Sequence, residues 1–542
     1  MRSRPKLLLS GFMGTGKSTV GHLVASRAGV AFLDLDARIE EAAGAPIAAI
    51  FADRGEPAFR ALEAEALRAA LTAEGVQVIA VGGGALLDPT SRRLALDRAR
   101  VVTLTARPRT IVKRTAGDTS RPLLAADPGS PPLPAAELEE RIRELQASRS
   151  AVYAEAHARI ATDALAPHEV ANLLARSWAD PILHVSLGAE SYGVRLTTNA
   201  PTAVADVVSG LDPSSVFVIT DTNVRDLTHG ELEDALGSRG VRVGGTVALP
   251  PGEEHKHLGA VEHALSAMVA QGADRDAVVV AHGGGVVSDV AGFSAATLLR
   301  GVRWVVVPTT LLGMVDASVG GKTGVDLGVA KNAVGAFHQP SAVVVAPAYV
   351  ATESPRAYAS GLAEVVKSAA IADPGLFELL ESQSAGVIAR DPEIVEQLVL
   401  RSIAVKAAIV GRDPHEQGER AVLNFGHTVG HALEAEGNFT RLTHGEAVGL
   451  GMIAALRVGV ALGFTDAALL DRVTALLARL GLPADLSSQP LKEALPLVAL
   501  DKKRKAGLIR FVLLRGLGAP FFRWLSLADL TNLLVSTRSV AT

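Results

Sequence analysis

The sequence contains no cysteine and is poor in aromatic residues, which make up only 4% of its 542 positions. Without cysteine the chain forms no disulfides and offers no thiolate ligands, so a zinc-type site must use histidine, carboxylates and water. With so few aromatic rings, leucine, valine and alanine must fill most of the hydrophobic cores, within an apolar fraction of 48%.

Two further absences narrow the class of protein. No uninterrupted apolar segment reaches the length of about 18 residues that a membrane-spanning helix needs, and the first residues lack the apolar core of a signal peptide. The net charge is only −4, and the one dense basic run, Lys502–Lys505, is too short to indicate a nucleic-acid surface. We therefore expect a cytoplasmic protein that acts on small molecules and has no nucleic-acid or membrane partner.

The chain is too long for a single hydrophobic core, and its pattern divides into three parts. Short apolar stretches alternate with helical periodicity up to about residue 160 and again from residue 184, whereas helical periodicity is nearly continuous from about residue 352. We predict a three-layer α/β domain over residues 1–176, a second α/β lobe over residues 182–350 and an all-helical lobe over residues 351–542.

The individual elements are predicted from the same pattern. The strands expected in the first domain are Leu7–Ser10, Ala31–Asp34, Val76–Val81 and Arg100–Thr105, with helices at Ala58–Ala73 and Leu138–Ala156. The strands expected in the second are His184–Leu187, Val216–Thr220, Val241–Leu249, Ala277–Ala281, Val302–Val307 and Ala342–Val345. The proline-rich segment Ala126–Pro134 reads as a surface loop.

A glycine-rich segment, GFMGTGKST over residues 11–19, follows the first predicted strand and precedes a helical pattern. This is the context of a phosphate-binding loop, because glycines let backbone N–H groups face a phosphate and the helix adds its positive dipole end. A lysine here reaches the outer phosphates, and the next hydroxyl binds Mg²⁺. The first domain is therefore predicted to bind ATP or GTP through Gly14, Gly16, Lys17, Ser18 and Thr19.

Carboxylates and arginines near this loop indicate phosphoryl transfer to an acceptor that carries a carboxylate. Asp34 and Asp36 end a predicted strand, where one can hold Mg²⁺ and the other can deprotonate a hydroxyl, although a helix cap is the alternative. Arg60 and Arg121 suit a carboxylate or a developing phosphoryl charge, because a guanidinium makes paired hydrogen bonds. Exposed surface arginines are the alternative for these two residues.

Together these motifs resemble shikimate kinase over about residues 5–160. The resemblance implies ATP-dependent 3-phosphorylation of shikimate, with Mg²⁺ at Ser18 and Asp34 and with Lys17, Asp36 and Arg121 in catalysis. It places Arg114 near adenine and Arg121 on a lid that closes over the phosphates. The substrate residues it implies are Asp36, Arg60, Gly82, Gly83, Gly84 and Arg149. The family usually has Arg-x-Pro-Leu-Tyr where this chain reads Arg149-Ser-Ala-Val-Tyr153.

The second α/β part has its own glycine cluster, Gly283-Gly284-Gly285, directly after a predicted strand and before a helical run. A glycine triplet alone fits a tight turn, but this position favours pyrophosphate binding. The spacing differs from GxGxxG, so an ordinary Rossmann dehydrogenase is not indicated.

The helical part contains His427 and His431 four residues apart, with His444 shortly downstream. This i, i+4 spacing can present two imidazoles to one metal ion, so from spacing alone both would be ligands; unrelated packed or exposed histidines are the alternative. Lysines scattered through apolar stretches suit a phosphorylated and carboxylated small molecule, although each alone reads as a solvated surface residue. They are Lys322, Lys331, Lys367 and Lys406.

Several segments of the second half closely resemble 3-dehydroquinate synthase, and the similarity extends over about residues 184–535. They are Pro308-Thr309-Thr310, residues 316–323, Lys331-Asn332 and Asn424-Phe-Gly-His427. The resemblance implies NAD, Zn²⁺ or Co²⁺, and conversion of 3-deoxy-D-arabino-heptulosonate 7-phosphate to 3-dehydroquinate and phosphate. It also revises the spacing argument: the metal ligands would be Glu364, His427 and His444, whereas His431 would bind substrate near its phosphate.

The resemblance implies further roles by position. The residues that match NAD contacts are Asp221, Asn223, Glu253, Lys256, Gly284, Gly285, Asp289, Thr309, Thr310 and Lys331. The residues that match substrate contacts or catalytic groups are Asp316, Lys322, Asn332, Lys367, Lys406, Arg420, Asn424 and His431, with one of Lys502 and Lys503. Arg300 would reach the site of a dimer partner, which implies a homodimer formed through the second half.

We interpret the chain as a bifunctional enzyme of aromatic amino-acid (chorismate) biosynthesis, in which a kinase is fused to a lyase that acts at a non-consecutive step. Two alternatives remain at this point. The second half is similar to metal-dependent polyol dehydrogenases, which would form NADH in net amounts. Alternatively, one half is a catalytically inactive scaffold.

Overall fold

The computed structural model describes residues 5–75, 77–115, 133–328, 330–500, 504–505 and 508–535. Arg121, Lys502, Lys503 and most of the predicted loop at 126–134 lie outside these residues. The chain forms two compact units, one made of Met1–Val216, Gly230–Val243 and Asp276–Val278, the other of Phe217–His229, Gly244–Arg275 and Val279–Thr542. The predicted domain limits at residues 176, 182 and 350 remain a prediction.

The first sheet has five parallel strands in the order β2-β3-β1-β4-β5. They are β1 (Lys6–Gly11), β2 (Ala31–Asp34), β3 (Gln77–Ala80), β4 (Ala99–Thr105) and β5 (Ala158–Ala161). The central strand β1 is buried along its whole length, which explains why its sequence reads as a continuous apolar run. Leu7 and Leu9 pack into the core on one face of the sheet, and Leu8 packs into the core on the other.

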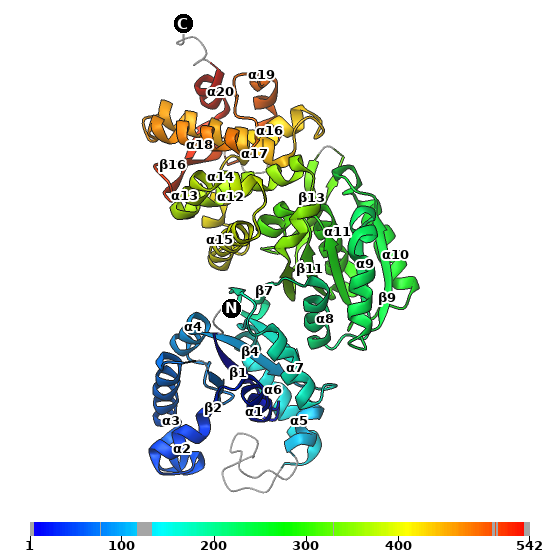
Figure 1. Ribbon diagram of the computed structural model, residues 1–542, viewed down its shortest axis with the longest axis vertical. Helices are drawn as coiled ribbons and strands as arrows, with labels where there is room; N and C mark the ends of the chain where they lie inside the picture. The colour runs from blue at the N-terminus through cyan, green and yellow to red at the C-terminus, as the bar shows by residue number, and fades with distance from the viewer. Residues whose placement is uncertain are drawn as a thin grey trace. The chain divides into compact units, whose positions relative to one another are not determined.

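Helices cover both faces of this sheet, as Figure 1 shows. One face packs against α1 (Lys17–Ala28) and α7 (Pro167–Ser177). The other packs against α2 (Leu35–Ala43), α3 (Ile47–Thr72) and α4 (Pro89–Arg98). The remaining helices are α5 (Pro108–Thr115) and α6 (Ala135–Ala154). The predicted three-layer α/β domain is confirmed.

The second sheet has seven strands in the order β6-β7-β14-β11-β10-β8-β9. They are β6 (Ile182–Val185), β7 (Tyr192–Leu196), β8 (Val216–Asp221), β9 (Val243–Leu249), β10 (Val278–Gly283), β11 (Arg303–Pro308) and β14 (Ala342–Val345). Its helices are α8 (Ala200–Gly210), α9 (Thr222–Gly237), α10 (Leu258–Ala270) and α11 (Gly285–Thr297). Every strand predicted for the two α/β parts is present, with ends shifted by at most one or two residues.

An unpredicted hairpin is formed by β12 (Lys322–Leu327) and β13 (Ala330–Phe337), which pair antiparallel. Its strands contain glycines that obscure the alternating pattern of a strand. Gly335 faces Gly324 across the hairpin, and a Cβ on Gly335 would lie 2.0 Å from the carbonyl oxygen of Thr323. The glycines therefore permit a close backbone approach that residue propensities do not indicate.

The C-terminal lobe is mainly helical. Its helices are α12 (Pro355–Ala372), α13 (Pro374–Ser382), α14 (Ser384–Ile388), α15 (Pro392–Arg412), α16 (His427–Glu436), α17 (His444–Ala461), α18 (Ala467–Arg479), α19 (Leu491–Ala494) and α20 (Leu527–Val535). Among the described residues, no helix combines the length and the apolar character needed to cross a bilayer.

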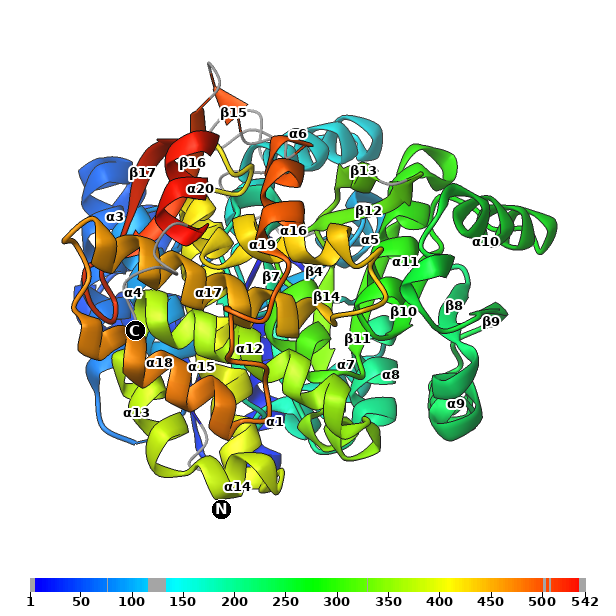
Figure 2. The ribbon, with the colours of Figure 1, turned by 90° about the horizontal axis from the view of Figure 1, so that it is seen from above.

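The prediction that this lobe is all-helical needs one correction. It also contains an antiparallel sheet of β15 (Arg504–Lys505), β16 (Leu508–Leu514) and β17 (Pro520–Ser526), beside α20 in Figure 2. The segments LIRFVLL and PFFRWLS are rich in β-branched and aromatic residues, which favour strands, and the helical periodicity of the preceding segments does not extend into them.

Glycines allow the two histidine-bearing helices, α16 and α17, to approach closely. A Cβ on Gly451 of α17 would lie 1.8 Å from the carbonyl oxygen of Gly426, at the start of α16. A Cβ on Gly430 would lie 2.9 Å from the carbonyl oxygen of Ala447. Because these neighbours are backbone atoms, they cannot move aside as a flexible side chain would.

We expect Gly451→Ala to lower the free energy of unfolding by about 3 kcal/mol, because the added methyl group would force α16 and α17 apart. Gly449→Ala, on the same helix, is the matched control, since its Cβ would lie 3.6 Å from Leu477 in ordinary contact. Urea or thermal unfolding of both variants measures the difference. Equal stability of the two variants would contradict the close packing of these helices.

Candidate active sites

The phosphate-binding loop lies between β1 and α1 and lines a cavity of about 490 Å³. Gly11, Gly14 and Gly16 have positive φ angles of 128°, 78° and 93°. A Cβ on Gly11 would lie 2.1 Å from the carbonyl oxygen of Leu104, so a side chain there would clash with β4. The loop residues predicted to bind nucleotide, Gly14, Gly16, Lys17, Ser18 and Thr19, all line this cavity.

The side chain of Lys17 contacts the backbone of its own loop. Its Nζ donates hydrogen bonds to the carbonyl oxygens of Gly11 at 2.9 Å and Phe12 at 3.0 Å. Ser18 Oγ donates to Asp34 Oδ2 at 2.6 Å, while Asp34 Oδ1 accepts from the backbone N–H of Asp36 at 3.1 Å. Asp34 thus caps α2 with one oxygen and contacts Ser18 with the other, so the two readings of this aspartate are compatible.

Asp36 lies in the same cavity, next to Gly82. Burial raises the pKa of Asp36, and the nearby Asp34 carboxylate raises it further. Its Oδ1 is buried and makes no hydrogen bond to any described residue. A Cβ on Gly82 would lie 2.8 Å from this oxygen and 2.9 Å from Glu63 Oε1, so only glycine fits between the two carboxylates.

Arg60 is not the freely solvated arginine that the alternative reading describes. Its guanidinium pairs with Glu63 at 2.6 Å and with Glu56 at 3.0 Å, and a Cβ on Gly84 would lie 2.4 Å from its Nη1. Glu63 is only 3% exposed, and the sequence analysis missed it. Its one signal is the i, i+3 spacing from Arg60 on α3, which is common on solvated helix faces.

Two further arginines of the predicted site contact residues in or beside this cavity. Arg149 is buried and donates to the carbonyl oxygen of Gly83 at 3.4 Å, which also accepts from the Tyr153 hydroxyl at 2.7 Å. Arg114 lines the cavity and donates to Thr162 Oγ1 at 2.9 Å. The predicted lid residue Arg121 lies outside the described residues.

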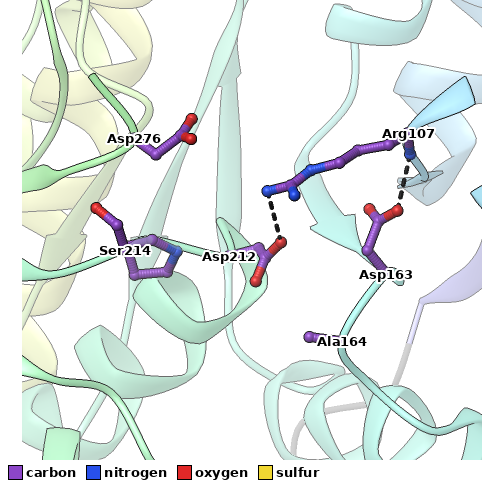
Figure 3. Close-up of a pocket in the computed structure, with 7 residues that line it drawn as sticks. Arg107, Asp163, Ala164, Asp212, Ser214 and Asp276 are labelled. Atoms are coloured by element: carbon purple, nitrogen blue, oxygen red, sulfur yellow. Dashed lines mark hydrogen bonds and ion pairs between the residues drawn. The ribbon is translucent and has the colours of Figure 1, made fainter. Parts of the chain in front are cut away.

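A separate cavity of about 370 Å³ is lined by Arg107, Asp163, Asp212 and Asp276, together with Ala164, Pro213 and Ser214. Within this cavity the backbone N–H of Arg107 donates to Asp163 Oδ1 at 2.9 Å, and the Arg107 guanidinium forms an ion pair with Asp212 at 3.3 Å (Figure 3). None of the residues predicted for either activity lines it. We therefore assign it no catalytic part.

In the helical lobe, Glu364 of α12 faces the first residues of α16 and α17. Glu364 Oε1 lies 3.6 Å from His427 Nε2 and 3.4 Å from His444 Nε2. The potential ligand atoms of these three residues lie within 4.8 Å of one another. Glu364 is 1% exposed, and its Oε1 has no hydrogen-bond partner in the described part of the chain, whereas Oε2 forms an ion pair with Lys367.

Both imidazoles are held by their other nitrogen. His427 Nδ1 lies 3.2 Å from the carbonyl oxygen of Phe425, and His444 Nδ1 lies 3.4 Å from Glu434 Oε2. The i, i+4 partner His431 is grouped differently, because its potential ligand atoms cluster with those of Glu434 and His444. The spacing of residues within one helix could not show that the carboxylate grouped with His427 and His444 is Glu364 of α12.

Two of the predicted lysines are buried beside this cluster. Lys367 forms an ion pair with Glu364 and lies 3.9 Å from Asp316, while Lys406 Nζ lies 2.6 Å from Asp316 Oδ1. Burial would raise the pKa of Asp316, but Lys406 and Lys367 together lower it below its ordinary value. The surface reading is therefore wrong for both lysines, which are 2% and 7% exposed.

Lys322 and Asn424 meet at a residue that the sequence analysis missed, Glu416. Lys322 forms an ion pair with Glu416, whose Oε1 accepts from Asn424 Nδ2 at 2.6 Å. The buried Arg420 donates to the carbonyl oxygen of Gly320 at 3.1 Å. Glu416 lies in an exposed polar loop without periodicity, so its sequence offers no signal of this contact.

The glycine triplet ends β10 and begins α11, with Gly284 as the N-cap residue. The backbone N–H of Thr309 donates to the carbonyl oxygen of Gly283 at 3.0 Å, and a Cβ on Gly284 would lie 3.2 Å from Thr310. At the end of β8, Asp221 Oδ1 accepts from the backbone N–H of Asn223 at 3.0 Å. These residues meet at the carboxyl ends of neighbouring strands, where α/β sheets bind ligands.

Lys256 connects this region to the β12–β13 hairpin. Its Nζ lies 2.5 Å from Asp289 Oδ2, 3.9 Å from Glu253 Oε1 and 2.6 Å from Asn332 Oδ1. Arg300, by contrast, is exposed in a turn with φ 70° and forms no hydrogen bond or ion pair with these residues in the part of the chain that the structure describes.

Comparison with known proteins identifies both halves. Family models described as 3-dehydroquinate synthase N-terminal and C-terminal match residues 246–360 and 361–504. The 3-dehydroquinate synthase of Paracoccus denitrificans is 43% identical over 346 residues, which cover 62% of this chain and 94% of that protein. The chain belongs to the 3-dehydroquinate synthase family. A family model described as shikimate kinase matches residues 13–178, so the chain also carries a shikimate kinase domain.

A further relative carries the same family name, and two solved structures are similar to the second half. The 3-dehydroquinate synthase of Acidithiobacillus ferrooxidans is 40% identical over 337 residues, which cover 62% of this chain and 92% of that protein. A 2-epi-5-epi-valiolone synthase from Streptomyces hygroscopicus, with NAD⁺ and Zn²⁺ bound, is 28% identical with a TM-score of 0.59, covering 64% of this chain and 97% of that one. A 2-deoxy-scyllo-inosose synthase, 24% identical with a TM-score of 0.60 over 66% of this chain and 99% of that one, shares the fold.

The two halves therefore make a bifunctional enzyme of the shikimate pathway, as the motifs predicted. The 3-dehydroquinate synthase part also contains a partly buried carboxyl to which no predicted role is assigned, Glu353. It accepts a hydrogen bond from the backbone N–H of Leu311, next to Thr310, and burial raises its pKa from 4.5 to about 7.

As the pH rises from about 4.5 to 7, we expect the free energy of unfolding of the wild-type protein to fall relative to that of Glu353→Gln. In this range the folded protein retains the proton of Glu353, whereas the unfolded chain releases it. The stabilisation that protonated Glu353 contributes is therefore greatest below the pKa of the unfolded chain and is lost as the pH rises through 7. Melting temperatures of both proteins across this range measure the effect. Parallel pH profiles would contradict the raised pKa of Glu353.

Proposed function

We propose that the first half transfers the γ-phosphoryl group of ATP to the 3-hydroxyl of shikimate within the cavity of about 490 Å³. The observation that carries this proposal is that the phosphate-binding loop and Asp36 line one cavity. Asp36 acts as the base, because its buried, unbonded Oδ1 can accept a hydroxyl proton and its raised pKa suits that task. Lys17, released from its loop carbonyls, would neutralise the outer phosphates.

The remaining residues of this half bind and orient. Ser18 and Asp34 offer two neighbouring oxygens for Mg²⁺, which supplies charge neutralisation of the phosphates when bound. Arg60, held by Glu63, and Arg149, at the carbonyl of Gly83, would bind the shikimate carboxylate. Arg114 would lie against adenine, and Arg121 would act from the lid, as the family resemblance implies.

In the second half, Glu364, His427 and His444 are proposed to hold Zn²⁺ or Co²⁺. They fit such an ion, because the buried Oε1 of Glu364, which has no hydrogen-bond partner among the described residues, faces two Nε2 atoms whose rings are held by their Nδ1 atoms. When bound, the metal polarises the substrate hydroxyl that is oxidised, and NAD accepts and later returns the hydride. The neighbour from Streptomyces hygroscopicus, with NAD⁺ and Zn²⁺ bound, supports this pair of cofactors.

The glycine triplet fits the pyrophosphate of NAD, because the N-terminus of α11 is free of side chains at Gly284 and Gly285. The other residues proposed to contact NAD surround this helix start or lie on the facing hairpin. They are Asp221, Asn223, Glu253, Lys256, Asp289, Thr309, Thr310 and Lys331.

Cationic and amide side chains of this half would bind the heptulosonate phosphate. Lys367 touches both Glu364 and Asp316, so it joins the metal site to the substrate site and would orient the reacting hydroxyl. Charged and polar groups would hold the leaving phosphate and the carboxylate, and stabilise the charge that develops during phosphate elimination. They are Lys322, Asn332, Lys406, Arg420, Asn424 and His431.

Two statements about the whole protein belong to the same proposal. The exposed left-handed turn at Arg300 would present this side chain to the active site of a second copy, which favours a homodimer formed through the synthase half. A cytoplasmic location is proposed because the kinase reaction draws on ATP and the synthase reaction on NAD.

We expect Lys17→Ala to reduce phosphorylation of shikimate at least about 100-fold, because the phosphates lose their principal cation, and to leave phosphate release from the heptulosonate unchanged. His444→Ala should have the opposite effect. Assays of ADP formation and of phosphate release on both variants separate the two halves. Loss of both activities in either variant would contradict independent sites.

Removal of the synthase metal with a zinc-selective chelator, in excess Mg²⁺, should stop phosphate release and spare phosphorylation. Return of Zn²⁺ or Co²⁺ should restore the release without net NADH formation, because the hydride is given back within the same turnover. Net NADH would support a polyol dehydrogenase instead. Phosphate release that persists without metal would refute the proposed metal chemistry.

A further inference from the structure

Glu434 is a buried carboxylate to which neither half's predicted chemistry assigns a role. It lies on α16, seven residues after His427 and three after His431, so all three side chains share one helix face. It is only 2% exposed. A carboxylate this deeply buried is costly unless charged or hydrogen-bonding partners compensate it.

One partner of Glu434 is the candidate ligand His444. Glu434 Oε2 lies 3.4 Å from His444 Nδ1, and on the opposite edge of the same ring Nε2 lies 3.4 Å from Glu364 Oε1. The imidazole is therefore held between two carboxylates. A histidine that binds a metal through one nitrogen commonly donates its other N–H to a carboxylate, which fixes the tautomer and orients the ring.

The other partner of Glu434 is Lys331 on β13. Lys331 Nζ lies 3.2 Å from Glu434 Oε1 and 3.3 Å from Glu253 Oε1, and it stands 4.7 Å from the centre of the Phe439 ring. Lys331 thus joins the carboxylate behind His444 to Glu253, a residue of the proposed NAD site. Glu434, Lys331 and Glu253 therefore form a series of charged contacts that runs from the proposed metal site through Lys331 of the hairpin to the proposed NAD site.

We propose that Glu434 is a positioning residue of the metal site, which holds His444 with Nε2 directed at Glu364 and ties this ligand to the β12–β13 hairpin through Lys331. The inference rests on the proposed metal-binding function of Glu364, His427 and His444. It adds a residue that acts through a ligand and does not itself bind the ion.

The same atoms allow a second arrangement, because potential ligand atoms of His431, Glu434 and His444 also lie within 4.8 Å of one another. Both oxygens of Glu434 are already engaged, Oε1 by the ammonium group of Lys331 and Oε2 by His444 Nδ1. Glu364, in contrast, keeps one oxygen, Oε1, that faces the Nε2 atoms of two imidazoles. Glu434 therefore fits an outer partner of His444 better than a ligand of its own metal.

The test compares the full-length wild-type protein with Glu434→Gln, which is nearly isosteric and keeps an oxygen that accepts from Nδ1 but loses the charge. The metal-free proteins are titrated with Zn²⁺ against a chromophoric chelator, and their Co²⁺ absorption spectra are recorded. We expect one metal ion per chain in both, with an affinity about 10- to 100-fold lower in Glu434→Gln and a shifted Co²⁺ spectrum.

Two further variants make the result specific. Glu436→Gln, two residues along α16, removes a carboxylate that pairs with Arg441 at 2.6 Å and should leave metal affinity and spectrum unchanged. Lys331→Met should weaken NAD binding more than metal binding, because Glu434 still holds His444. Unchanged shikimate phosphorylation and a cooperative melting transition in each variant verify that the chain is folded.

The outcomes separate this inference from the function on which it depends. If the wild-type protein bound no metal, the proposed function itself would fail. If wild-type and Glu434→Gln proteins bound metal with equal affinity and gave the same Co²⁺ spectrum, Glu434 would have no positioning role. Two metal ions per wild-type chain, with one lost in Glu434→Gln, would make Glu434 a ligand and overturn the inference.

Discussion

The synthase half depends on the compensation of one buried charge, the carboxylate of Glu364. Burial alone would raise its pKa, but the ammonium group of Lys367, one helical turn along α12, holds the pKa below its ordinary value. His427 and His444 approach the same carboxylate from the starts of two other helices. A buried carboxylate that faces two imidazoles is costly to keep for packing alone, whereas a divalent cation would be held by the carboxylate and both imidazoles.

The packing of α12, α16 and α17 brings Glu364, His427 and His444 together. The glycine contacts between α16 and α17 set the separation of His427 and His444, and the contact of Gly445 with the backbone of Ser360 brings the start of α17 against α12. The kinase half also buries charged side chains, among them Glu63 and Arg149. Its phosphate-binding loop adds uncharged donors, because the loop offers backbone N–H groups and a helix end in the cavity that Lys17 lines.

Local patterns predicted most of the framework. Buried parallel strands such as β1 are continuous apolar runs, and the phosphate-binding loop carries its function in the order of its residues, so both were predicted from the sequence. The four-residue edge strand β5, the strand β7, the glycine-containing hairpin β12–β13 and the strands β16 and β17 were missed. β5 pairs with β4, which lies far earlier in the chain, so a periodicity read along the sequence does not report it. The strands β12 and β13 pair with each other across a short turn, but their glycines interrupt the alternating pattern.

The sites show the same division. Motif resemblance led to Glu364, His427 and His444, whereas spacing alone paired His427 with His431, because a helix face reports only its own residues. Glu63, Glu416 and Glu434 were missed although each contacts a predicted residue. Acidic side chains at these positions look like ordinary solvated glutamates in the sequence. Only the fold shows that each one contacts an arginine, lysine or histidine of a candidate site.

The most direct test of this account is anomalous diffraction from crystals of the purified protein, recorded at the absorption edge of the bound metal. We predict one anomalous peak per chain, within coordination distance of Glu364, His427 Nε2 and His444 Nε2. A peak beside His431 and Glu434 instead, or metal-loaded protein without a peak at Glu364, would contradict the claim that the buried carboxylate is the centre of the site.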